Sequence, residues 1–134
     1  MPAPTLDDYR RVAELRELLR RFMRRSERLA RVAGLTPSRY LLLLMIKGAP
    51  DGSERSTVTE LAERLQLTQS TVTELVTRAE DAGLVRREQA EHDARVYWIC
   101  LTAEGERRLS SVVEGHDPER HRLLELLSLL DGSS

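Results

Sequence analysis

The stretch TVTELAERLQLTQSTVTELVTRAEDAGLVRR, residues 57–87, decides the fold of this chain. Apolar residues recur in it at steps of three and four, which predicts two short helices. Thr57 and Glu60 match a capping box at the start of the first helix. Thr68 is a favourable N-cap for the second helix, and Gly83 stands where its C-cap is expected. The letters LTQ form the turn between the two helices.

The hydrophobic period changes from helical to strand-like after these helices. Residues 84–89 and 95–101 are rich in residue types that favour strands, and the polar letters AEHDA at 90–94 predict a hairpin tip. Two short helices, a tight turn and a two-stranded hairpin make up the winged helix-turn-helix plan. In that plan the second helix enters the DNA major groove. Winged domains also serve as protein-interaction modules, so the pattern leaves that alternative open.

A long amphipathic helix precedes this core. Over residues 7–32 apolar side chains follow a heptad-like stripe, which gives the helix more apolar surface than one small domain needs. The surplus predicts an interaction surface; the alternative is that the whole stripe packs within its own chain. The stripe includes Val12, Leu15, Leu19, Phe22 and Leu29.

Turn and cap signals divide the rest of the chain. Those at residues 36–37 predict a buried helix that ends at Lys47, and the letters GAPDGSERS that follow are expected to form a loop. After the hairpin, Thr102 is a favourable N-cap, and Asp117 offers a second cap. The last helix is dense in leucine and is expected to end at Gly132.

The charge balance limits the functions open to the chain. Its 134 residues include 21 Lys+Arg and 22 Asp+Glu, which excludes a freestanding basic protein and leaves nucleic-acid binding to local patches. One cysteine excludes an internal disulfide framework, and no structural zinc spacing occurs. The longest apolar run, residues 40–46, is too short to span a bilayer, and the N-terminus lacks the order of a signal peptide. We therefore expect a cytoplasmic protein that has no membrane partner.

The order and spacing of these motifs resemble the MarR family of bacterial transcription regulators. The resemblance is carried by LAERL.LT.STVTELV, by GLVRR, and by the wing pattern D.R followed by LT.EG. It covers residues 57–109 and extends over the first helix and GLTPSRYLLL. It implies a mainly α fold with a small β-hairpin wing, in a single domain over residues 1–134. The implied parts are dimerisation helices at 7–33 and 103–131 and a winged helix-turn-helix lobe at 37–102.

The resemblance also implies a mode of action. Members form an obligate homodimer through their N- and C-terminal helices and bind a short pseudo-palindrome on double-stranded DNA, usually as repressors. A small-molecule effector often causes release of the DNA. In members of the family the effector binds in a pocket between the dimer helices and the winged lobe. The residues expected to form the dimer are Val12, Leu15, Leu19, Phe22, Leu123, Leu127 and Leu130.

The chain departs from the family pattern at three places. Gln66 replaces the glycine that is common at the turn, so the backbone is expected to differ slightly there. Ala94 stands in the wing tip where relatives often have a basic residue. The tail after the wing is short and is expected to lack a full final helix, so details of the dimer interface are expected to differ.

The second helix of the central pair offers a hydrogen-bonding face, because Val72, Leu75, Val76 and Ala79 are expected to point inward. Gln69 can hydrogen-bond an adenine edge, and Ser70 and Thr73 suit base edges or a thymine methyl. In the wing, Asp93 is expected to orient Arg95 for a minor-groove or backbone contact. The full set of expected DNA contacts is Arg39, Thr68, Gln69, Ser70, Thr73, Thr77, Arg78, Arg86, Arg87, Asp93 and Arg95.

Other residues admit two interpretations each. Glu74 either accepts from a cytosine amino group or turns away from the groove, and we favour the second. The basic residues within 20–31 are interpreted as the solvated face of the dimer helix, with contact to DNA or to an acidic partner as the alternative. Cys100 is interpreted as a packed small hydrophobe and not a redox sensor.

No motif points to a catalytic or metal site. The sequence holds no Gly-rich phosphate loop, nucleophile elbow or HExxH, so we expect neither an enzyme nor a cofactor. His116 and His121 are five residues apart, whereas two ligands on one helix face need four, so a metal-sensing site is the less favoured interpretation.

Overall fold

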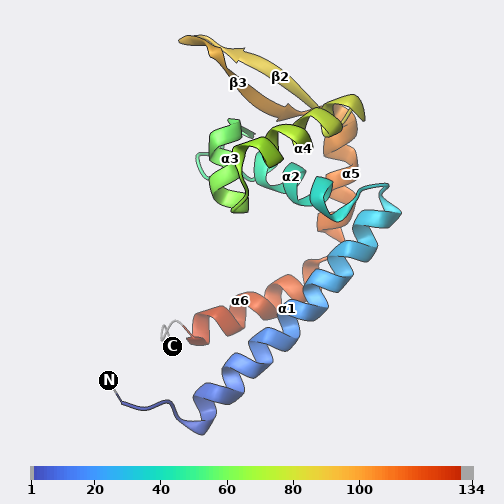
Figure 1. Ribbon diagram of the computed structural model, residues 1–134. Coiled ribbons are helices and arrows are strands. Elements are labelled where there is room, and N and C mark those ends of the chain that lie inside the picture. Colours follow the sequence, from blue (N-terminus) through green and yellow to red (C-terminus); the bar gives the residue numbers. More distant parts are fainter. Residues whose placement is uncertain (1, 131–134) are drawn as a thin grey trace.

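The computed structural model describes residues 2–130, except for the side chains of residues 117–119 and 130. The elements are α1 (Leu6–Val32), α2 (Pro37–Lys47), β1 (Arg55–Ser56), α3 (Val58–Leu65), α4 (Gln69–Asp81), β2 (Val85–Ala90), β3 (Asp93–Leu101), α5 (Ala103–Glu114) and α6 (Asp117–Leu130). Figure 1 shows a winged lobe of α2, α3, α4 and the strands, joined through α5 to an arm in which α6 lies beside α1. The expected mainly α fold with a small wing is confirmed. No single helix in the described part of the chain is long and apolar enough to cross a membrane; α1 and α2 pass that test only as a pair bent by 98°.

Local caps set the ends of the two central helices. The Thr57 hydroxyl accepts a hydrogen bond from the Glu60 amide at 3.2 Å, and the Glu60 carboxylate accepts one from the Thr57 amide at 3.1 Å. Thr68 caps α4 by accepting from the amide of Thr71, and Gly83 follows α4 with φ +76°. The predicted capping box, N-cap and terminal glycine are therefore confirmed.

The turn between α3 and α4 contains a left-handed residue that is not glycine. Gln66 has φ +56° and ψ +46°, a conformation that costs a residue with a Cβ roughly 1–2 kcal/mol. The next amide, of Leu67, donates to the carbonyl of Ala62 at 3.0 Å and closes α3. The chain thus keeps a conformation that favours glycine, and the consequence of carrying glutamine there is backbone strain.

A third strand joins the two that the sequence predicts. β1 pairs antiparallel with β3, with Arg55 opposite Cys100, and the sheet order is β1-β3-β2. The expectation of a loop over residues 48–56 is therefore wrong for its last two residues, because a two-residue strand is too short to show a period. The hairpin tip is also tighter than expected, since β2 ends at Ala90 and β3 begins at Asp93.

The core of the lobe lies where α2, α4 and α5 meet the sheet. Leu43, Val76, Ile99 and Val112 come from these four parts of the chain, and all are fully buried in one cluster. Burying a side chain of this size stabilises a fold by about 1.5–3 kcal/mol relative to leaving it exposed. This shared core fixes the position of α4 relative to the wing.

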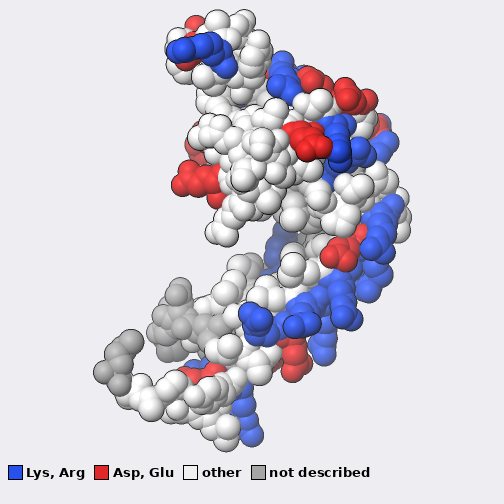
Figure 2. All heavy atoms as spheres, viewed as in Figure 1, with Lys and Arg blue, Asp and Glu red and all other residues white. Residues whose placement is uncertain are grey.

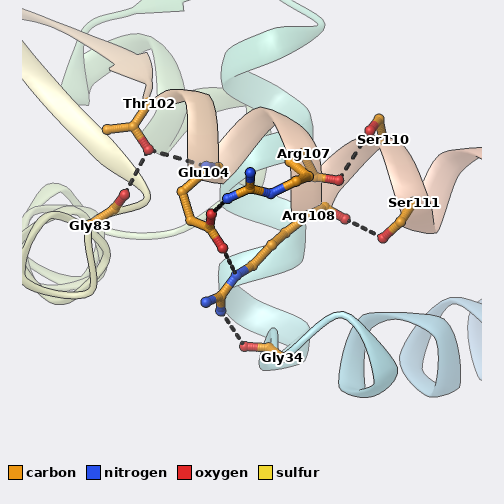
Figure 3. Close-up of polar contacts among 9 residues, drawn as sticks. Gly34, Gly83, Thr102, Glu104, Arg107, Arg108, Ser110 and Ser111 are labelled. Carbon is orange, nitrogen blue, oxygen red and sulfur yellow. Dashed lines mark hydrogen bonds and ion pairs between the residues drawn. The ribbon is translucent and has the colours of Figure 1, made fainter.

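The end of α4, the end of the sheet and the start of α5 meet at Thr102. Its hydroxyl donates to the carbonyl of Gly83 at 2.6 Å and accepts from the amide of Gly105 at 3.1 Å (Figure 3). Its amide donates to the carbonyl of Leu84 at 3.0 Å. A Cβ on Gly105 would lie 2.1 Å from the Leu84 carbonyl oxygen, so only glycine lets α5 pack this closely. We call this set of contacts the Thr102 junction.

Contacts between α1 and the C-terminal part of the chain hold the arm together. The buried imidazole of His116 stacks on Phe22 with ring centroids 4.4 Å apart, and its Nε2 shares a 2.8 Å hydrogen bond with the Ser26 hydroxyl. Further out, Arg122 of α6 donates to the Glu14 carboxylate at 2.6 Å. The arm of one chain is therefore a helix pair tied by both stacking and charge.

The leucine-dense last segment forms a helix, α6, as the sequence predicts. α6 has 14 residues and begins at Asp117 itself, which was expected to precede the helix as its cap. The short tail is therefore helical up to Leu130. The expected end at Gly132 lies outside the described residues.

One chain covers only part of the predicted dimer surface. Leu123 is buried, and Leu15 and Phe22 are half-buried. The members that stay open are Val12, Leu19 and Leu127, at 49%, 38% and 50% exposure, and the side chain of Leu130 lies outside the described residues. The alternative that the whole stripe of α1 packs within its own chain is therefore wrong for two of its members, Val12 and Leu19.

Replacing Gln66 with glycine should stabilise the protein. Glycine adopts the left-handed conformation without steric cost, so we expect Gln66→Gly to raise the free energy of unfolding by about 1 kcal/mol. Gln66→Ala retains a Cβ and serves as the matched control, with no gain expected. Urea unfolding followed by circular dichroism measures both variants, and equal stability of the two would contradict the assignment of strain to this position.

Candidate nucleic-acid interface

The outward face of α4 matches the sequence prediction. The inward positions are buried at Val72, Val76 and Ala79 and half-buried at Leu75, and the outward residues Gln69, Ser70, Thr73, Thr77 and Arg78 are all exposed. The first turns of this face, residues 69–73, carry no charge. They lie at the N-terminal end of the helix, where the backbone dipole is positive.

Some hydroxyls on this face are already engaged within the protein. Thr68 Oγ1 accepts from the Thr71 amide at 3.2 Å as the helix cap. Thr77 donates to the carbonyl of Thr73 at 2.9 Å and accepts from Arg87 at 3.2 Å. The Gln69 amide group has no hydrogen-bond partner among the described residues, which leaves it available to an external ligand.

A cleft of about 310 Å³ joins α4 to the wing. Gln69 and Thr73 of α4 line one side, and Arg95 and Tyr97 of β3 line the other, with Arg87 of β2 also on its wall. Tyr97 is 43% exposed and was not among the expected DNA contacts. Its position in the sequence could have indicated its place in the cleft. Tyr97 is two positions after Arg95 on a predicted strand, and alternate residues of a strand share a face.

The wing holds its arginine in the expected way. The Asp93 carboxylate accepts from the backbone amide of Arg95 at 3.0 Å and from its guanidinium at 3.3 Å. These contacts, the amide first, hold the pKa of Asp93 below its usual range. The Arg95 side chain remains 91% exposed, so Asp93 orients it without covering it.

Carboxylates accompany three further arginines of the lobe, Arg78, Arg86 and Arg87. Glu74 lies one turn before Arg78 on α4 and contacts it at 2.5 Å, which accounts for the presence of this acid on the helix. The Arg87 guanidinium contacts Glu80 at 3.3 Å. Figure 2 shows acidic and basic side chains next to one another on the lobe. The expected positive charge of this surface is therefore largely balanced within the chain.

The structure separates the two neighbouring arginines of β2. Arg87 lines the cleft, whereas Arg86 pairs with Glu88 and lines a different hollow beside Cys100. The strand alternation explains the separation, because successive side chains point to opposite faces. Arg39, at the start of α2, is not among the residues that line the cleft. Geometry thus supports Arg87 more than Arg86 or Arg39.

An ion-pair network on α5 connects the lobe to the arm (Figure 3). Glu104 of α5 pairs with Arg107 and, at 2.7 Å, with Arg108. Arg108 also donates to the carbonyl of Gly34 in the corner between α1 and α2, at 3.3 Å. The start of α5 is therefore linked both to the arm and, through the Thr102 junction, to the wing and α4.

Cys100 and the histidines lie in different surroundings. Cys100 is buried, and burial raises the pKa of its thiol, which disfavours the reactive thiolate. His116 is buried against Phe22, and His121 is exposed. Among the described residues, no three His, Cys, Asp or Glu side chains gather in a way that could hold a metal ion.

Comparisons with known sequences identify related proteins. The family described as MarR family matches residues 33–96. The repressor YetL of Bacillus subtilis is 35% identical over 83 residues, 62% of this chain and 48% of YetL. The transcriptional regulator HosA of Escherichia coli is 35% identical over 94 residues, 70% of this chain and 67% of HosA. The matched region thus spans about half to two thirds of these relatives.

Comparisons of structure agree with those of sequence. AbsC, a MarR family transcriptional regulator from Streptomyces coelicolor, superposes with a TM-score of 0.71 at 25% identity, covering 99% of this chain and 93% of AbsC. Sco3205, a MarR family regulator from the same organism solved in complex with DNA, gives a TM-score of 0.64 at 27% identity, covering 92% and 76%. A MarR family protein from Bacillus stearothermophilus is 32% identical with a TM-score of 0.69, covering 92% and 84%.

Proposed function

The chain belongs to the MarR family, and we propose that it is a transcriptional regulator that binds a pseudo-palindromic DNA operator as a homodimer and represses transcription. The observation that carries the proposal is the cleft that places Gln69 and Thr73 of α4 opposite Arg95 of the wing. A reading helix and a wing that share one cleft can hold the edge of a major groove and the adjoining backbone together. The name of YetL as a repressor and the DNA complex of Sco3205 support this function.

The side chains divide into base readers and backbone holders. Gln69 and Thr73 stand on the uncharged first turns of α4, where Gln69 suits an adenine edge and Thr73 a thymine methyl. Arg95 extends from the wing to the minor groove or the flanking phosphates. Arg78 and Arg87 lie further along, beside their carboxylate partners, and hold phosphate.

A second copy of the chain completes the dimer. The exposed residues Val12, Leu19 and Leu127 of the arm remain for a partner to cover, as the family pattern implies. Two lobes related by a twofold axis would then present two α4 helices to half-sites about one helical turn apart. A cytoplasmic location is part of the same proposal.

A cavity beside the arm supports control by a small effector. It measures about 120 Å³ and is lined mainly by apolar side chains of α1 and α2, among them Phe22, Met23, Tyr40, Leu41 and Leu44. α1 belongs to the arm and α2 to the lobe, so a ligand between them bears on the angle between arm and lobe. A change in that angle alters the spacing of the two α4 helices and thereby DNA affinity.

The rival function is a winged protein-interaction module with weak or no DNA binding. The carboxylate partners of Arg78, Arg86, Arg87 and Arg95 favour it, because they reduce the attraction of the lobe to a polyanion. The rival function predicts no specific complex with the protein's own upstream DNA. A gel-shift assay with that DNA therefore separates the two functions.

Removing the proposed readers should weaken specific binding. We expect Arg95→Ala and Gln69→Ala each to lower affinity for the upstream DNA by about tenfold or more, the loss typical of a base-edge contact. Arg10→Ala, an exposed arginine on the arm, is the matched control and should bind like the wild type. Gel-shift titrations measure all three, and unchanged binding by both cleft variants would refute the site assignment.

Releasing Arg78 from its carboxylate should increase affinity. In Glu74→Gln the guanidinium becomes free to neutralise a phosphate, so we expect tighter binding and a log–log salt slope steeper by about 1. Glu63→Gln removes an exposed acid of α3 that has no ion pair among the described residues, and it is the control. Fluorescence anisotropy over a salt series provides the slopes. A Glu74→Gln slope equal to that of wild type would show that the ion pair with Glu74 does not limit the contact of Arg78 with phosphate.

Filling the cavity should abolish effector binding without unfolding the lobe. Leu41 lines the cavity but is 44% exposed, so Leu41→Trp adds volume there without overpacking the core. In a thermal-shift screen of small aromatic compounds, those that raise the melting temperature of the wild type should not raise that of Leu41→Trp. Equal shifts for both proteins would place the ligand site elsewhere.

A further inference from the structure

The charge of α1 is unevenly distributed along its length. The first half carries the acids Asp7, Asp8, Glu14 and Glu17 together with Arg10, Arg11 and Arg16. The second half, residues 20–31, carries Arg20, Arg21, Arg24, Arg25, Arg28 and Arg31 against the single acid Glu27. Figure 2 shows basic side chains gathered along α1. In a chain with a net charge of −1, this half-helix is a strong local excess of positive charge.

Four of these residues form a straight line on the helix surface. Arg20, Arg24, Arg28 and Arg31 follow one another at steps of four, four and three, so they share one face of α1. All four are exposed, whereas Ser26 and Ala30, on the opposite face, are buried. At 1.5 Å per residue the line is about 16 Å long. We call these four residues the arginine stripe.

The arginine stripe differs from the arginines of the lobe in its pairing. Within the described part of the chain, no member of the stripe makes an ion pair, although a member of an ordinary solvated helix face often finds an acid one turn away. Glu27, the one acid of this half of α1, lines the cavity toward α2 instead. The lobe has the base-reading geometry but balanced charge; the stripe has uncompensated charge and no base-reading geometry.

We propose that the arginine stripe binds the phosphate backbone of duplex DNA outside the operator and supplies much of the salt-dependent affinity. The proposal rests on the DNA-binding function proposed above. It extends that function by assigning a second DNA surface to the arm. In this proposal α4, through Gln69 and Thr73, selects the operator sequence, and the arginine stripe binds the adjoining duplex.

The chemistry of the stripe favours DNA over other polyanions. Guanidinium groups bind phosphate through paired N–H donors, and a duplex offers a rigid linear array with one charge per about 1.7 Å of axis. A membrane-bound basic helix also inserts apolar side chains beside its charges. In this half of α1, Phe22 and Ala30 pack within the chain, whereas Met23 and Val32 are exposed as single residues that are separated along the helix. The stripe therefore matches a rigid phosphate array in charge and spacing, and binding to lipid vesicles is the outcome that the test must separate from it.

The test compares two DNA fragments at several salt concentrations. One is limited to the operator identified by footprinting; the other extends it by about two helical turns of unrelated sequence on each side. For the wild type we expect the extended fragment to bind more tightly, with a salt slope steeper by about 7, because the dimer brings two stripes of four arginines and each neutralised phosphate contributes about 0.9. Arg20→Gln/Arg24→Gln/Arg28→Gln/Arg31→Gln should bind both fragments with the same slope and keep its affinity for the short one.

Two controls separate the stripe from folding and from overall charge. The corresponding four-lysine variant keeps the charges and should retain most of the added slope; if it loses as much as the glutamine variant, the effect is structural and the proposal fails. Arg10→Gln/Arg11→Gln/Arg16→Gln removes charge from the first half of α1 and should leave the added slope in place. If it removes the added slope equally, the effect belongs to overall charge and the stripe has no special role. Sedimentation confirms that every variant has the oligomeric state of the wild type.

The remaining outcomes are also decisive. If the wild type binds the operator fragment but extension changes neither affinity nor slope, the stripe proposal fails and the proposed function stands. If the wild type binds no operator fragment at all, both fail. Vesicles of anionic phospholipid serve as the second probe. Vesicle binding that the glutamine variant loses, without any effect of DNA extension, would assign the stripe to a lipid surface and overturn the proposal.

Discussion

The close approach of α5 to the end of α4 at the Thr102 junction is the constraint on which the rest of the structure depends. One hydroxyl links the carbonyl of Gly83 to the amide of Gly105, and the absence of a Cβ on Gly105 lets the Leu84 carbonyl lie against the helix. The recognition helix, the wing and the helix that leads to the arm are thereby fixed to one another. The cleft between Gln69 and Arg95 exists because these elements cannot shift independently. Reading of DNA bases requires such a fixed arrangement of α4 and the wing, because base contacts tolerate little displacement of the side chains that make them.

The proposed reading helix, α4, carries few basic residues. Its first turns, residues 69–73, are uncharged, and its one arginine, Arg78, is paired with Glu74. A helix of this composition can discriminate bases but attracts a polyanion only weakly. Under the proposed function the attraction comes from other surfaces, and the arginine stripe of α1 supplies four arginines that make no ion pair within the described part of the chain. In the proposed function, this separation of specificity from attraction is what would let a chain with a net charge of −1 bind DNA without being basic as a whole.

Much of the fold could be predicted because its signals are local. The caps at Thr57, Thr68 and Thr102 need only a few neighbouring residues, and the inward face of α4 follows from helical spacing. The strand β1 escaped prediction because two residues carry no period. In the candidate site, Gln69 and Arg95 were predictable from motif position, but their meeting with Tyr97 in one cleft depends on how α4 and the sheet pack. The pairing of Arg87 with Glu80, and the burial of His116 against Phe22, likewise join residues that only the tertiary structure brings together.

The central claim is that α4 and the wing of a dimer read a defined DNA sequence. Selection of bound duplexes from a random pool by the purified full chain, followed by sequencing, tests this claim most directly. The account predicts enrichment of one pseudo-palindrome whose half-sites lie about one helical turn apart, and loss of that enrichment in Gln69→Ala. Enrichment of no sequence above the starting pool, at salt concentrations where the protein is folded and dimeric, would contradict it.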